Sequence, residues 1–382
     1  MSSSCIMSSN ESIVFDPSMI QNQPKLPKEF IWAGFDSMQQ QENNNDMLNE
    51  PLVDLEGFFK GDEEAIKHAA ELINKACLTH GFFQVTNHRV DSSLIGAAHD
   101  QMDGLFKLPL DKKLRVQRNK GEMWGYSGAH AHRFSKQLPW KETFSFGYNY
   151  VDDQGGLMNS YKPIVFDYIK SSLGEDFEYA GIRRWVYQRY CEAMKDLSLV
   201  IFELLAISLG IERQYFRKFF EDGTSLFRCN SYPPCNEPSL TFGTGPHCDP
   251  TSLTILHQDQ VGGLEVFAHN KWQAVRPRQD AFVINIGDTF MAMSNGRYKS
   301  CLHRAVVNKK KERKSLVFFV NPKEDKIVRA PQDLIDREEG TKSRKYPDFK
   351  WPHLMEFTQF HYRADVTTLQ SFFQWLPSSN LP

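Results

Sequence analysis

Residues 244–256 read TGPHCDPTSLTIL, and the rest of the chain is best understood outward from this stretch. A Gly-Pro turn signal precedes His247-Cys248-Asp249, and the apolar, β-branched run that follows predicts a strand at 252–257. In an extended segment, residues i and i+2 point to the same face. His247 and Asp249 can therefore converge on one metal ion, while Cys248 points away.

Short apolar segments broken by turn signals extend from this stretch in both directions. The predicted strands are residues 226–230, 252–257, 264–268, 272–275, 281–286, 297–301, 303–308 and 314–320. Turn signals between them include Pro233-Pro234, Gly262-Gly263 and Asn295-Gly296. Many short, closely spaced strands favour a sandwich or barrel over a sheet built from strand–helix–strand units.

Helical patterns frame this β-rich part. Apolar residues at helical spacing predict helices at 62–80, 92–106, 108–117, 179–209 and 364–376, with short strands at 53–55 and 82–86. The helix predicted to end before Gly210 is the longest, and a helix of that length can support a sheet along one face. The sequence therefore predicts a mainly β fold with α-helices: a barrel core framed by N-terminal helices and a C-terminal helix.

Composition divides the chain into four regions. Residues 1–50 are rich in Ser, Asn and Gln and are expected to form a disordered tail. Residues 51–224 are expected to form a helical and mixed region, residues 225–325 the barrel, and residues 326–382 a C-terminal helical extension. The tail lacks the apolar core of a signal peptide and the first arginine is Arg89, so we expect a cytoplasmic protein.

Charge and cysteine content exclude several classes of protein. The formal net charge is −2 and the pI is about 6.6, which does not favour a nucleic-acid partner. Seven scattered cysteines without a C-x-x-C pair argue against a disulfide framework or a structural zinc site, and favour a reducing compartment. No run approaches 18 apolar residues, so no membrane span is expected. A monomer is the default expectation.

The third metal ligand must come from another strand, and His303 is the best-placed candidate at the start of the apolar segment 303–308. Two imidazoles and one carboxylate on one side of a metal leave three positions open, as in non-haem iron(II) oxygenases. An H-x-D pattern is common by chance, so His247, Asp249 and His303 alone do not establish a metal site.

Arg313 and Ser315 strengthen the interpretation. They lie across a predicted hairpin whose tip is near residues 308–311, so antiparallel pairing would place Arg313 roughly opposite His303. If Arg313 and Ser315 share the inward face, a guanidinium fork and a hydroxyl lie close to the metal and suit the far carboxylate of a keto acid. The alternative is a solvated basic hairpin.

Tyr232 and Asn230 precede the Pro233-Pro234 turn. Tyr232 could donate its phenolic hydroxyl to the same carboxylate, and Asn230 could brace the keto-acid end. The alternative for Tyr232 is a core tyrosine beside a turn.

These motifs together resemble the plant 2-oxoglutarate-dependent dioxygenase superfamily, and within it the gibberellin 20-oxidase family. The resemblance rests on residues 230–235 (NSYPPC), 244–256, 285–292 (NIGDTFMA), 295–300 (NGRYKS), His303 with Arg313 and Ser315, and 138–143 (LPWKET), and it covers roughly residues 50–365. It implies a double-stranded β-helix, or jelly roll, that uses Fe²⁺, 2-oxoglutarate and O₂, with ascorbate as reductant. The implied reaction is successive oxidation and loss of C-20 from C20 gibberellin precursors.

The resemblance also implies a pocket for a diterpenoid acid, which requires aromatic walls and at least one cation. Trp140 and Lys141 of the 138–143 motif are the candidates, with Arg133 and Tyr126 nearby. Alternatively, Trp140 packs helices against the barrel and Lys141 is solvated.

Three other functions remain open from the sequence. The first is another plant oxygenase of this fold, such as a gibberellin 3- or 2-oxidase or a flavonoid oxidase. The second is a non-catalytic hormone-binding barrel, which the Arg313 and Ser315 pair disfavours because a binder needs no keto-acid site. The third is a zinc hydrolase.

Overall fold

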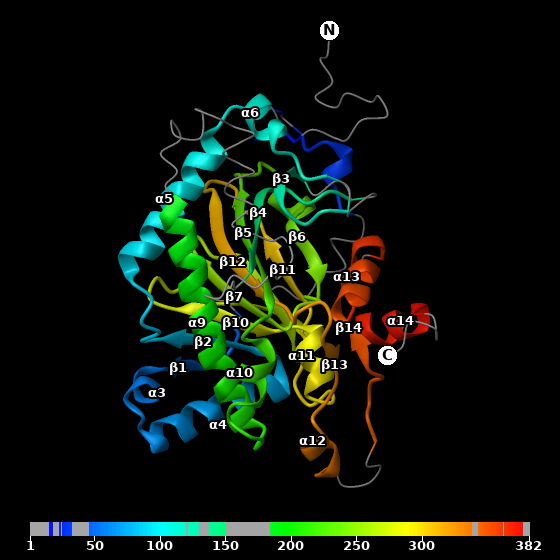
Figure 1. The fold of residues 1–382 in the computed structure, drawn as a ribbon. Coiled ribbons are helices and arrows are strands. Elements are labelled where there is room, and N and C mark those ends of the chain that lie inside the picture. Colours follow the sequence, from blue (N-terminus) through cyan, green and yellow to red (C-terminus); the bar gives the residue numbers. More distant parts are fainter. Residues whose placement is uncertain are drawn as a thin grey trace.

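Two β-sheets form the centre of the computed structural model, which describes residues 15–17, 23, 25–32, 46–119, 121–129, 137–149, 184–337, 343–361 and 363–376 (Figure 1). The larger sheet has the strand order β1-β2-β10-β7-β12-β5-β4-β3. Its strands are β1 (Leu52–Asp54), β2 (Phe82–Thr86), β3 (Gly125–Gly128), β4 (Glu142–Asn149), β5 (Thr224–Tyr232), β7 (Leu253–Gln258), β10 (Phe282–Ile286) and β12 (Arg313–Val320). The smaller sheet has the order β6-β11-β8-β9. Its strands are β6 (Phe242–His247), β8 (Leu264–Ala268), β9 (Lys271–Ala274) and β11 (His303–Val306).

The two sheets face each other across a cavity, because Asn230 and Arg313 of the larger sheet and Leu264 and His303 of the smaller one line the same space. Every residue of β10 is buried. The strand alternates between two sides: Ile284 packs in the core cluster with the helices, and Val283 packs in the cluster with β8. The predicted jelly-roll core framed by helices is confirmed.

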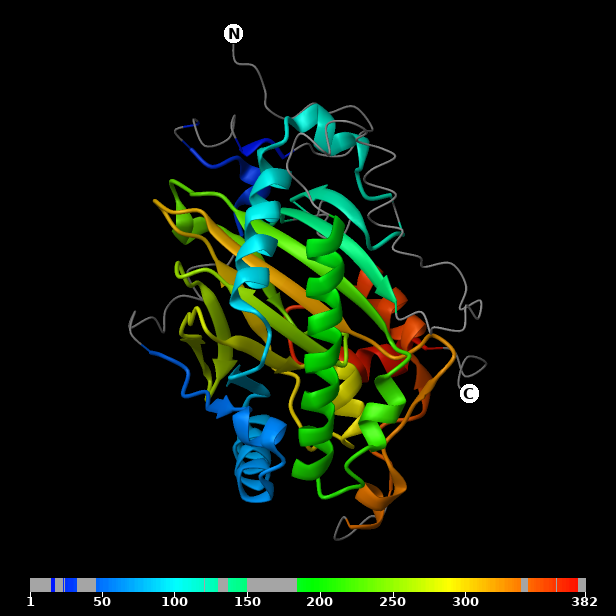
Figure 2. The ribbon, with the colours of Figure 1, turned by 60° about the vertical axis from the view of Figure 1, so that its left-hand side comes forward.

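Helices cover the outer face of the larger sheet (Figure 2). The N-terminal ones are α3 (Glu56–Lys60), α4 (Glu63–Thr79), α5 (Ser92–Lys107), α6 (Leu110–Arg115), α9 (Arg184–Ser208) and α10 (Tyr215–Phe220). Asp62 caps α4 by accepting from the backbone N–H groups of Glu64 and Ala65. The long helix α9 lies across the sheet and contacts α4 and α5, as the supporting helix predicted from the sequence should.

The predicted hairpin between His303 and Arg313 is wrong. Strand β11 pairs with β6 and β8, and β12 pairs with β5 and β7, so the two strands belong to different sheets. Both edges of each strand are occupied by these partners, which leaves no edge for pairing with each other. The residues near 308–311 therefore form a crossover between sheets. His303 and Arg313 meet only because the sheets face each other.

The strand predicted at 297–301 is also absent. Helix α11 (Asp288–Met293) lies just before this region, and it is followed by a turn in which Asn295 and Gly296 have left-handed φ values of 55° and 75°. Tyr298 is then held in the core because its hydroxyl accepts a hydrogen bond from Nδ2 of Asn74 and shares another with the hydroxyl of Ser208.

The described residues of the first 50 pack against the barrel. The 3₁₀ helix η1 (Lys28–Phe30) precedes Trp32, and Phe15, Phe30 and Trp32 are all buried. At these positions the expected disordered tail is part of the packed structure, because aromatic side chains find an apolar surface around Trp140.

The C-terminal region contains α12 (Gln332–Asp336), α13 (Trp351–Phe360) and α14 (Thr368–Trp375), with β13 (Ile327–Val328) paired to β14 (Phe349–Lys350). The predicted region boundaries at 50, 224 and 325 stay predictions. Strand β4 pairs with β5 along its length, so the second and third regions contribute to one sheet. In the described part of the chain, no helix has the length and apolar content needed to cross a bilayer.

Candidate active site

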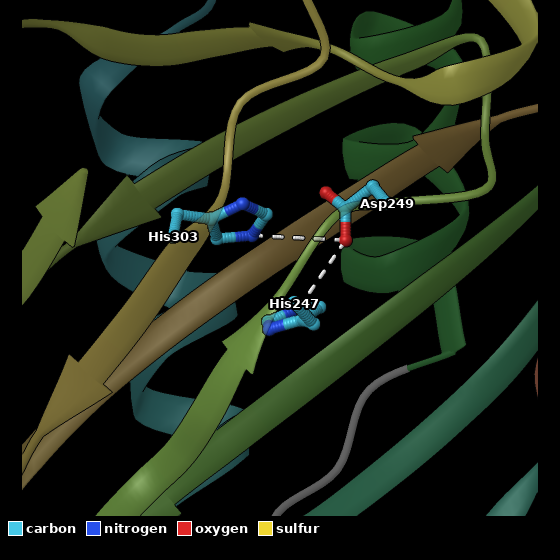
Figure 3. Close-up of side chains that lie close together, drawn as sticks. All are labelled: His247, Asp249 and His303. Carbon is cyan, nitrogen blue, oxygen red and sulfur yellow. Dashed lines mark ion pairs between the residues drawn. The ribbon is translucent and has the colours of Figure 1, made fainter. Parts of the chain in front are cut away.

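His247, Asp249 and His303 lie together in the space between the two sheets (Figure 3). Nε2 of His247 is 3.4 Å from Oδ1 of Asp249, and Nε2 of His303 is 3.7 Å from the same oxygen. His247 ends β6 and His303 begins β11, and the two residues are partners in the antiparallel ladder, which brings their ring centroids to 4.3 Å. Among the described residues, this is the only group of three such side chains placed to hold a metal ion.

The second nitrogen of each imidazole fixes the orientation of the ring. Nδ1 of His247 is 2.9 Å from the carbonyl oxygen of Gly245, and Nδ1 of His303 is 3.1 Å from that of Cys301. A carbonyl oxygen only accepts, so Nδ1 donates in both rings and Nε2 is the nitrogen that faces Asp249. This is the hydrogen-bonding pattern that orients histidine ligands of metals.

Asp249 offers one oxygen to a metal. Its Oδ2 accepts hydrogen bonds from Oγ1 of Thr254 at 2.7 Å and Nδ2 of Asn285 at 3.0 Å, which leaves Oδ1 toward the histidines. Burial alone would raise the pKa of Asp249, but the adjacent His303 and His247 and the hydrogen bond from Asn285 hold that pKa well below its usual range. The group therefore supplies an ionised carboxylate beside two imidazole nitrogens, a donor set that fits Fe²⁺.

Arg313 lies in the same cavity, which has a volume of about 540 Å³. The side chain is 1% exposed, its Nη2 donates to Oε1 of Gln258 at 3.0 Å, and its guanidinium lies over the ring of Tyr232 at 4.8 Å. Nε and Nη1 have no hydrogen-bond partner in the structure. Burying unpaired charged N–H groups is costly unless an anion accepts from them. The cavity therefore fits a dianion that reaches from Arg313 to the metal ligands.

Tyr232, Asn230 and Ser315 lie near Arg313 on the paired strands β5 and β12. Arg313 pairs with Tyr232 across the strands and Ser315 pairs with Asn230. Tyr232 and Asn230 line the cavity, whereas Ser315 is fully buried and accepts a hydrogen bond from Nδ2 of Asn230 at 3.2 Å. Gly243 makes room for the tyrosine, because a Cβ there would lie 2.4 Å from the ring of Tyr232.

A second cavity, of about 720 Å³, shares His247 and Asp249 with the first. Its apolar walls come from Met123, Leu226, Phe319, Trp351 and Met355, and its cationic side chains are Arg118, Lys141 and Arg228. A cavity that combines apolar walls with a few charged groups is typical of a site for a small organic ligand.

The structure brings only part of the 138–143 motif to these cavities. Lys141 lines both of them, and its Nζ donates to Oγ1 of Thr244 at 2.9 Å. Trp140 packs edge-on against Phe15 and Phe30 and donates from Nε1 to the carbonyl of Pro233 at 3.0 Å.

Tyr126 is buried and donates to Oε1 of Glu142 at 2.7 Å, outside both cavities. Trp140 also lies outside the residues that line them. The fourth candidate, Arg133, lies outside the residues that the structure describes.

Sequence reasoning missed Thr254, Gln258, Asn285 and Arg228. The two-residue repeat of a strand would have found Arg228, which stands two positions before Asn230 on β5 and so faces the same way. Thr254 and Asn285 are ladder partners on β7 and β10, and Gln258 is the partner of Ser315. These pairings depend on strand order, which periodicity does not give.

Comparison with known proteins agrees with this geometry. The family model of the 2OG-Fe(II) oxygenase superfamily matches residues 223–322, and the model described as non-haem dioxygenase in morphine synthesis N-terminal matches residues 51–164. Gibberellin 20 oxidase 2 of Arabidopsis thaliana is 50% identical over 372 residues, which cover 97% of this chain and 92% of that protein. Gibberellin 20 oxidase 2 of Oryza sativa subsp. japonica is 52% identical over 357 residues, which cover 94% and 87%.

Solved structures show the same fold. The crystal structure of JOX2 in complex with 2OG, Fe and JA has a TM-score of 0.75 and 29% identity, covering 95% of this chain and 98% of that one. The dioxygenase for auxin oxidation in rice has a TM-score of 0.62 and 26% identity, covering 81% and 94%.

A jelly roll that gathers two histidines and a carboxylate beside a buried, unsatisfied arginine defines an iron(II)- and 2-oxoglutarate-dependent dioxygenase. Within this class, about half of the residues are identical to those of gibberellin 20 oxidases over nearly the whole chain. The chain belongs to the gibberellin 20 oxidase family.

Proposed function

We propose that this enzyme oxidises C-20 of C20 gibberellin precursors in successive steps and releases that carbon to give C19 gibberellins, while 2-oxoglutarate is decarboxylated to succinate. The main support is that two cavities meet at His247 and Asp249: one reaches the buried Arg313, and the other has apolar walls and cations. The first cavity suits a keto dicarboxylate, and the second suits an apolar ring system that carries a carboxylate.

His247, Asp249 and His303 are the proposed ligands of Fe²⁺. When bound, the iron with 2-oxoglutarate and O₂ supplies the oxidising chemistry. The chain supplies the geometry: the Gly245 and Cys301 carbonyls keep both Nε2 atoms directed at the metal position. Thr254 and Asn285 restrict Asp249 to one ligating oxygen, which leaves the remaining positions for the co-substrate and O₂.

Arg313 and Tyr232 are the proposed ligands of the far carboxylate of 2-oxoglutarate. Gln258 holds one end of the guanidinium, so the unsatisfied N–H groups are already oriented before the co-substrate arrives. Ser315 and Asn230 act as a hydrogen-bonded pair, with Ser315 fixing the Asn230 amide at the cavity wall.

The apolar wall of the second cavity has the proposed role of excluding water from the reacting carbon. Trp351 and Met355 of the C-terminal helix α13 form part of this wall. Phe319 of β12 lines both cavities and lies where they meet. Trp351 is fixed by a hydrogen bond from Nε1 to the carbonyl of Pro250 at 3.2 Å, close in sequence to Asp249. Water exclusion strengthens the electrostatic interactions of the bound acid.

The deciding experiment is incubation of the purified protein with a C20 gibberellin precursor, Fe²⁺, ascorbate and 2-oxoglutarate, followed by mass-resolved product analysis. We expect the C-20 alcohol, the aldehyde and a C19 product to appear in turn, with succinate formed at each step. Hydroxylation elsewhere on the skeleton would instead indicate a gibberellin 3- or 2-oxidase. Oxidation of flavonoids alone would contradict the gibberellin assignment, and binding without succinate release would indicate a hormone-binding barrel.

We also propose that the enzyme acts as a cytoplasmic monomer without nucleic-acid or membrane partners. The small net charge of −2 and the six free cysteines among the described residues support this proposal. Size-exclusion chromatography with light scattering and imaging of a fluorescent fusion test it. A dimeric mass or an organellar signal would contradict it.

A further inference from the structure

Strand β5 contributes to both cavities with one face. Leu226, Arg228, Asn230 and Tyr232 alternate along this strand, and alternate residues point to the same side. Leu226 lines only the second cavity, Asn230 and Tyr232 line only the first, and Arg228 lines both. Arg228 therefore stands at the boundary between the proposed substrate and the proposed co-substrate.

The orientation of Arg228 is fixed by its neighbours. Its Nε donates to Oγ of Ser145 at 2.9 Å, and Ser145 is its ladder partner on β4. Its guanidinium lies over the ring of Phe319 at 5.3 Å, and Phe319 also lines both cavities. A guanidinium held at Nε and supported on an aromatic face is well arranged for two-point binding of a carboxylate.

The charges lining the joined cavities call for an anionic substrate. The cationic lining residues are Arg118, Lys141, Arg228, Arg304 and Arg313, and Asp249 is the only acidic one among the described lining residues. Arg304 is paired with Glu265, its Nε lying 2.6 Å from the carboxylate, and Arg313 is assigned to the co-substrate. Bound Fe²⁺ would leave one positive charge after Asp249 is counted, and Arg313 adds a second. The two negative charges of 2-oxoglutarate balance both. Arg118, Lys141 and Arg228 are the cationic side chains that line the second cavity.

Geometry favours Arg228 among these three. Lys141 donates to Thr244 and its Nζ lies 6.0 Å from the centre of the Tyr232 ring, on the side of the co-substrate. Arg118 lines the second cavity alone, away from the residues of the first. Of these three residues, only Arg228 combines a planar guanidinium with a position that lines both cavities.

We propose that Arg228 binds a carboxylate of the substrate and thereby fixes which carbon faces His247 and Asp249. The inference rests on the proposed function, and it makes Arg228 a determinant of specificity for acidic substrates. A ligand anchored at this boundary would have its carboxylate beside the co-substrate cavity and its ring system against Leu226, Phe319 and Met355.

The test compares a C20 gibberellin precursor as the free acid and as its methyl esters, on wild type and on Arg228→Gln. For the free acid we expect KM to rise by about 10- to 100-fold in Arg228→Gln, the effect of losing a hydrogen-bonded charge pair. The wild type should prefer the free acid over the ester that blocks the anchored carboxylate by a similar factor, and Arg228→Gln should lose this preference. KM for 2-oxoglutarate should change by less than about twofold, because Arg313 is intact.

Three controls keep the result interpretable. Arg228→Lys should restore part of the preference for the free acid, because it keeps the charge but loses the fork. Arg329→Gln, at an exposed arginine paired with Asp348, should behave as wild type. Thermal unfolding and the visible charge-transfer band of the iron(II)–2-oxoglutarate complex should report a folded, loaded site in each variant.

Two outcomes would overturn the proposal. One is a KM increase in Arg228→Gln that is equal for acid and esters; the other is a preference for the acid that disappears in Arg118→Gln but persists in Arg228→Gln. Failure of the proposed function is separate, because it shows as absence of C19 product from wild type. In that case anaerobic calorimetry with the same acid and esters still decides the role of Arg228, and equal binding of acid and esters by wild type would overturn it.

Discussion

The two cavities that meet at the metal ligands are built in different ways. The co-substrate cavity is formed almost entirely by strands, with Arg313 of β12 beside Tyr232 of β5 in one ladder. The substrate cavity is assembled from separate parts of the chain: the segment around Arg118 and Met123, strand β5, and Trp351 and Met355 of α13. The geometry of a strand ladder is rigid and repeats every two residues, whereas the wall of the substrate cavity depends on how distant segments of the chain pack together. The first cavity should therefore tolerate little change, and the second should tolerate more.

The largest expected effect comes from the metal ligands that both cavities share. His303→Ala should reduce turnover to the level of a blank without enzyme, because two ligands cannot hold the iron in the facial arrangement. Turnover and bound iron should be measured together. His68→Ala, at an exposed histidine of α4, is the matched control and should keep full activity. Full iron-dependent turnover in His303→Ala would show that the assigned ligand set is wrong.

A change at Arg313 should separate the two cavities. Arg313→Ala should raise KM for 2-oxoglutarate by about 10- to 100-fold, since it removes a charge-assisted interaction of about 1.5–3 kcal/mol. KM for the gibberellin substrate should change much less, because Arg313 does not line the second cavity. Steady-state kinetics with each substrate varied in turn measures both values. An equal rise in the two KM values would break the distinction between the cavities.

Trp140 lies outside both cavities, so a change there should affect stability and leave binding in both cavities intact. Trp140→Phe should lower the free energy of unfolding by about 1–3 kcal/mol, because it leaves the Pro233 carbonyl without its donor in a buried site. KM for either substrate should change by less than about twofold. Denaturant unfolding and kinetics on the same preparations give both numbers. Trp185→Phe, at a tryptophan that is 49% exposed, is the control. A large rise in the gibberellin KM with unchanged stability would return Trp140 to the substrate pocket.

The last expected effect concerns the pH dependence of stability and lies behind the sheet, outside both cavities. Nε2 of His99 on α5 is 2.8 Å from Nδ1 of His257 on β7. Burial is the main cause that lowers the pKa of His99 from 6.5 to about 4. His257 and Lys314 lower this pKa further, and Asp103 opposes them. The folded state therefore binds this proton less readily than the unfolded chain. Stability contributed by neutral His99 is complete above about pH 6.5 and is lost as the pH falls toward about 4.

The measurement is the free energy of unfolding of wild type and His99→Gln across this pH range. The variant should lose less stability on acidification, by about 1.4 kcal/mol for each unit of pKa difference removed. Comparison at pH 7.5 provides the control, since His99 is neutral there in both states. Identical pH profiles for the two proteins would refute the assignment.

The sequence predicted correctly those side-chain positions that depend only on the spacing of residues within one extended segment. His247 and Asp249 converge because they stand two apart in extended backbone, and Arg313 and Ser315 are both buried for the same reason. His303 and Arg313 line one cavity, although the hairpin predicted between them is wrong. Their meeting depends on two sheets facing each other, and no local pattern distinguishes that arrangement from a direct pair.

The substrate cavity was predicted least well, for a physical reason. Trp140 and Lys141 are neighbours in the sequence, yet one packs against Phe15 and Phe30 and the other lines both cavities. Adjacent residues of an extended segment point to opposite sides, so a motif cannot act as a unit on one ligand. Met355 and Trp351 approach from a C-terminal helix whose position is fixed by tertiary packing.

The inward face of β5 sets a fixed length scale inside the molecule. Successive inward residues of a strand are about 6.6–6.8 Å apart, so the separation between Arg228 and Asn230 cannot be adjusted by mutation without breaking the ladder. A relative that accepts a longer or shorter acid has to gain or lose space at α13 or around Met123 instead. Attempts to redesign the substrate range of this enzyme should therefore begin with α13 and the segment around Met123, and leave β5 unchanged.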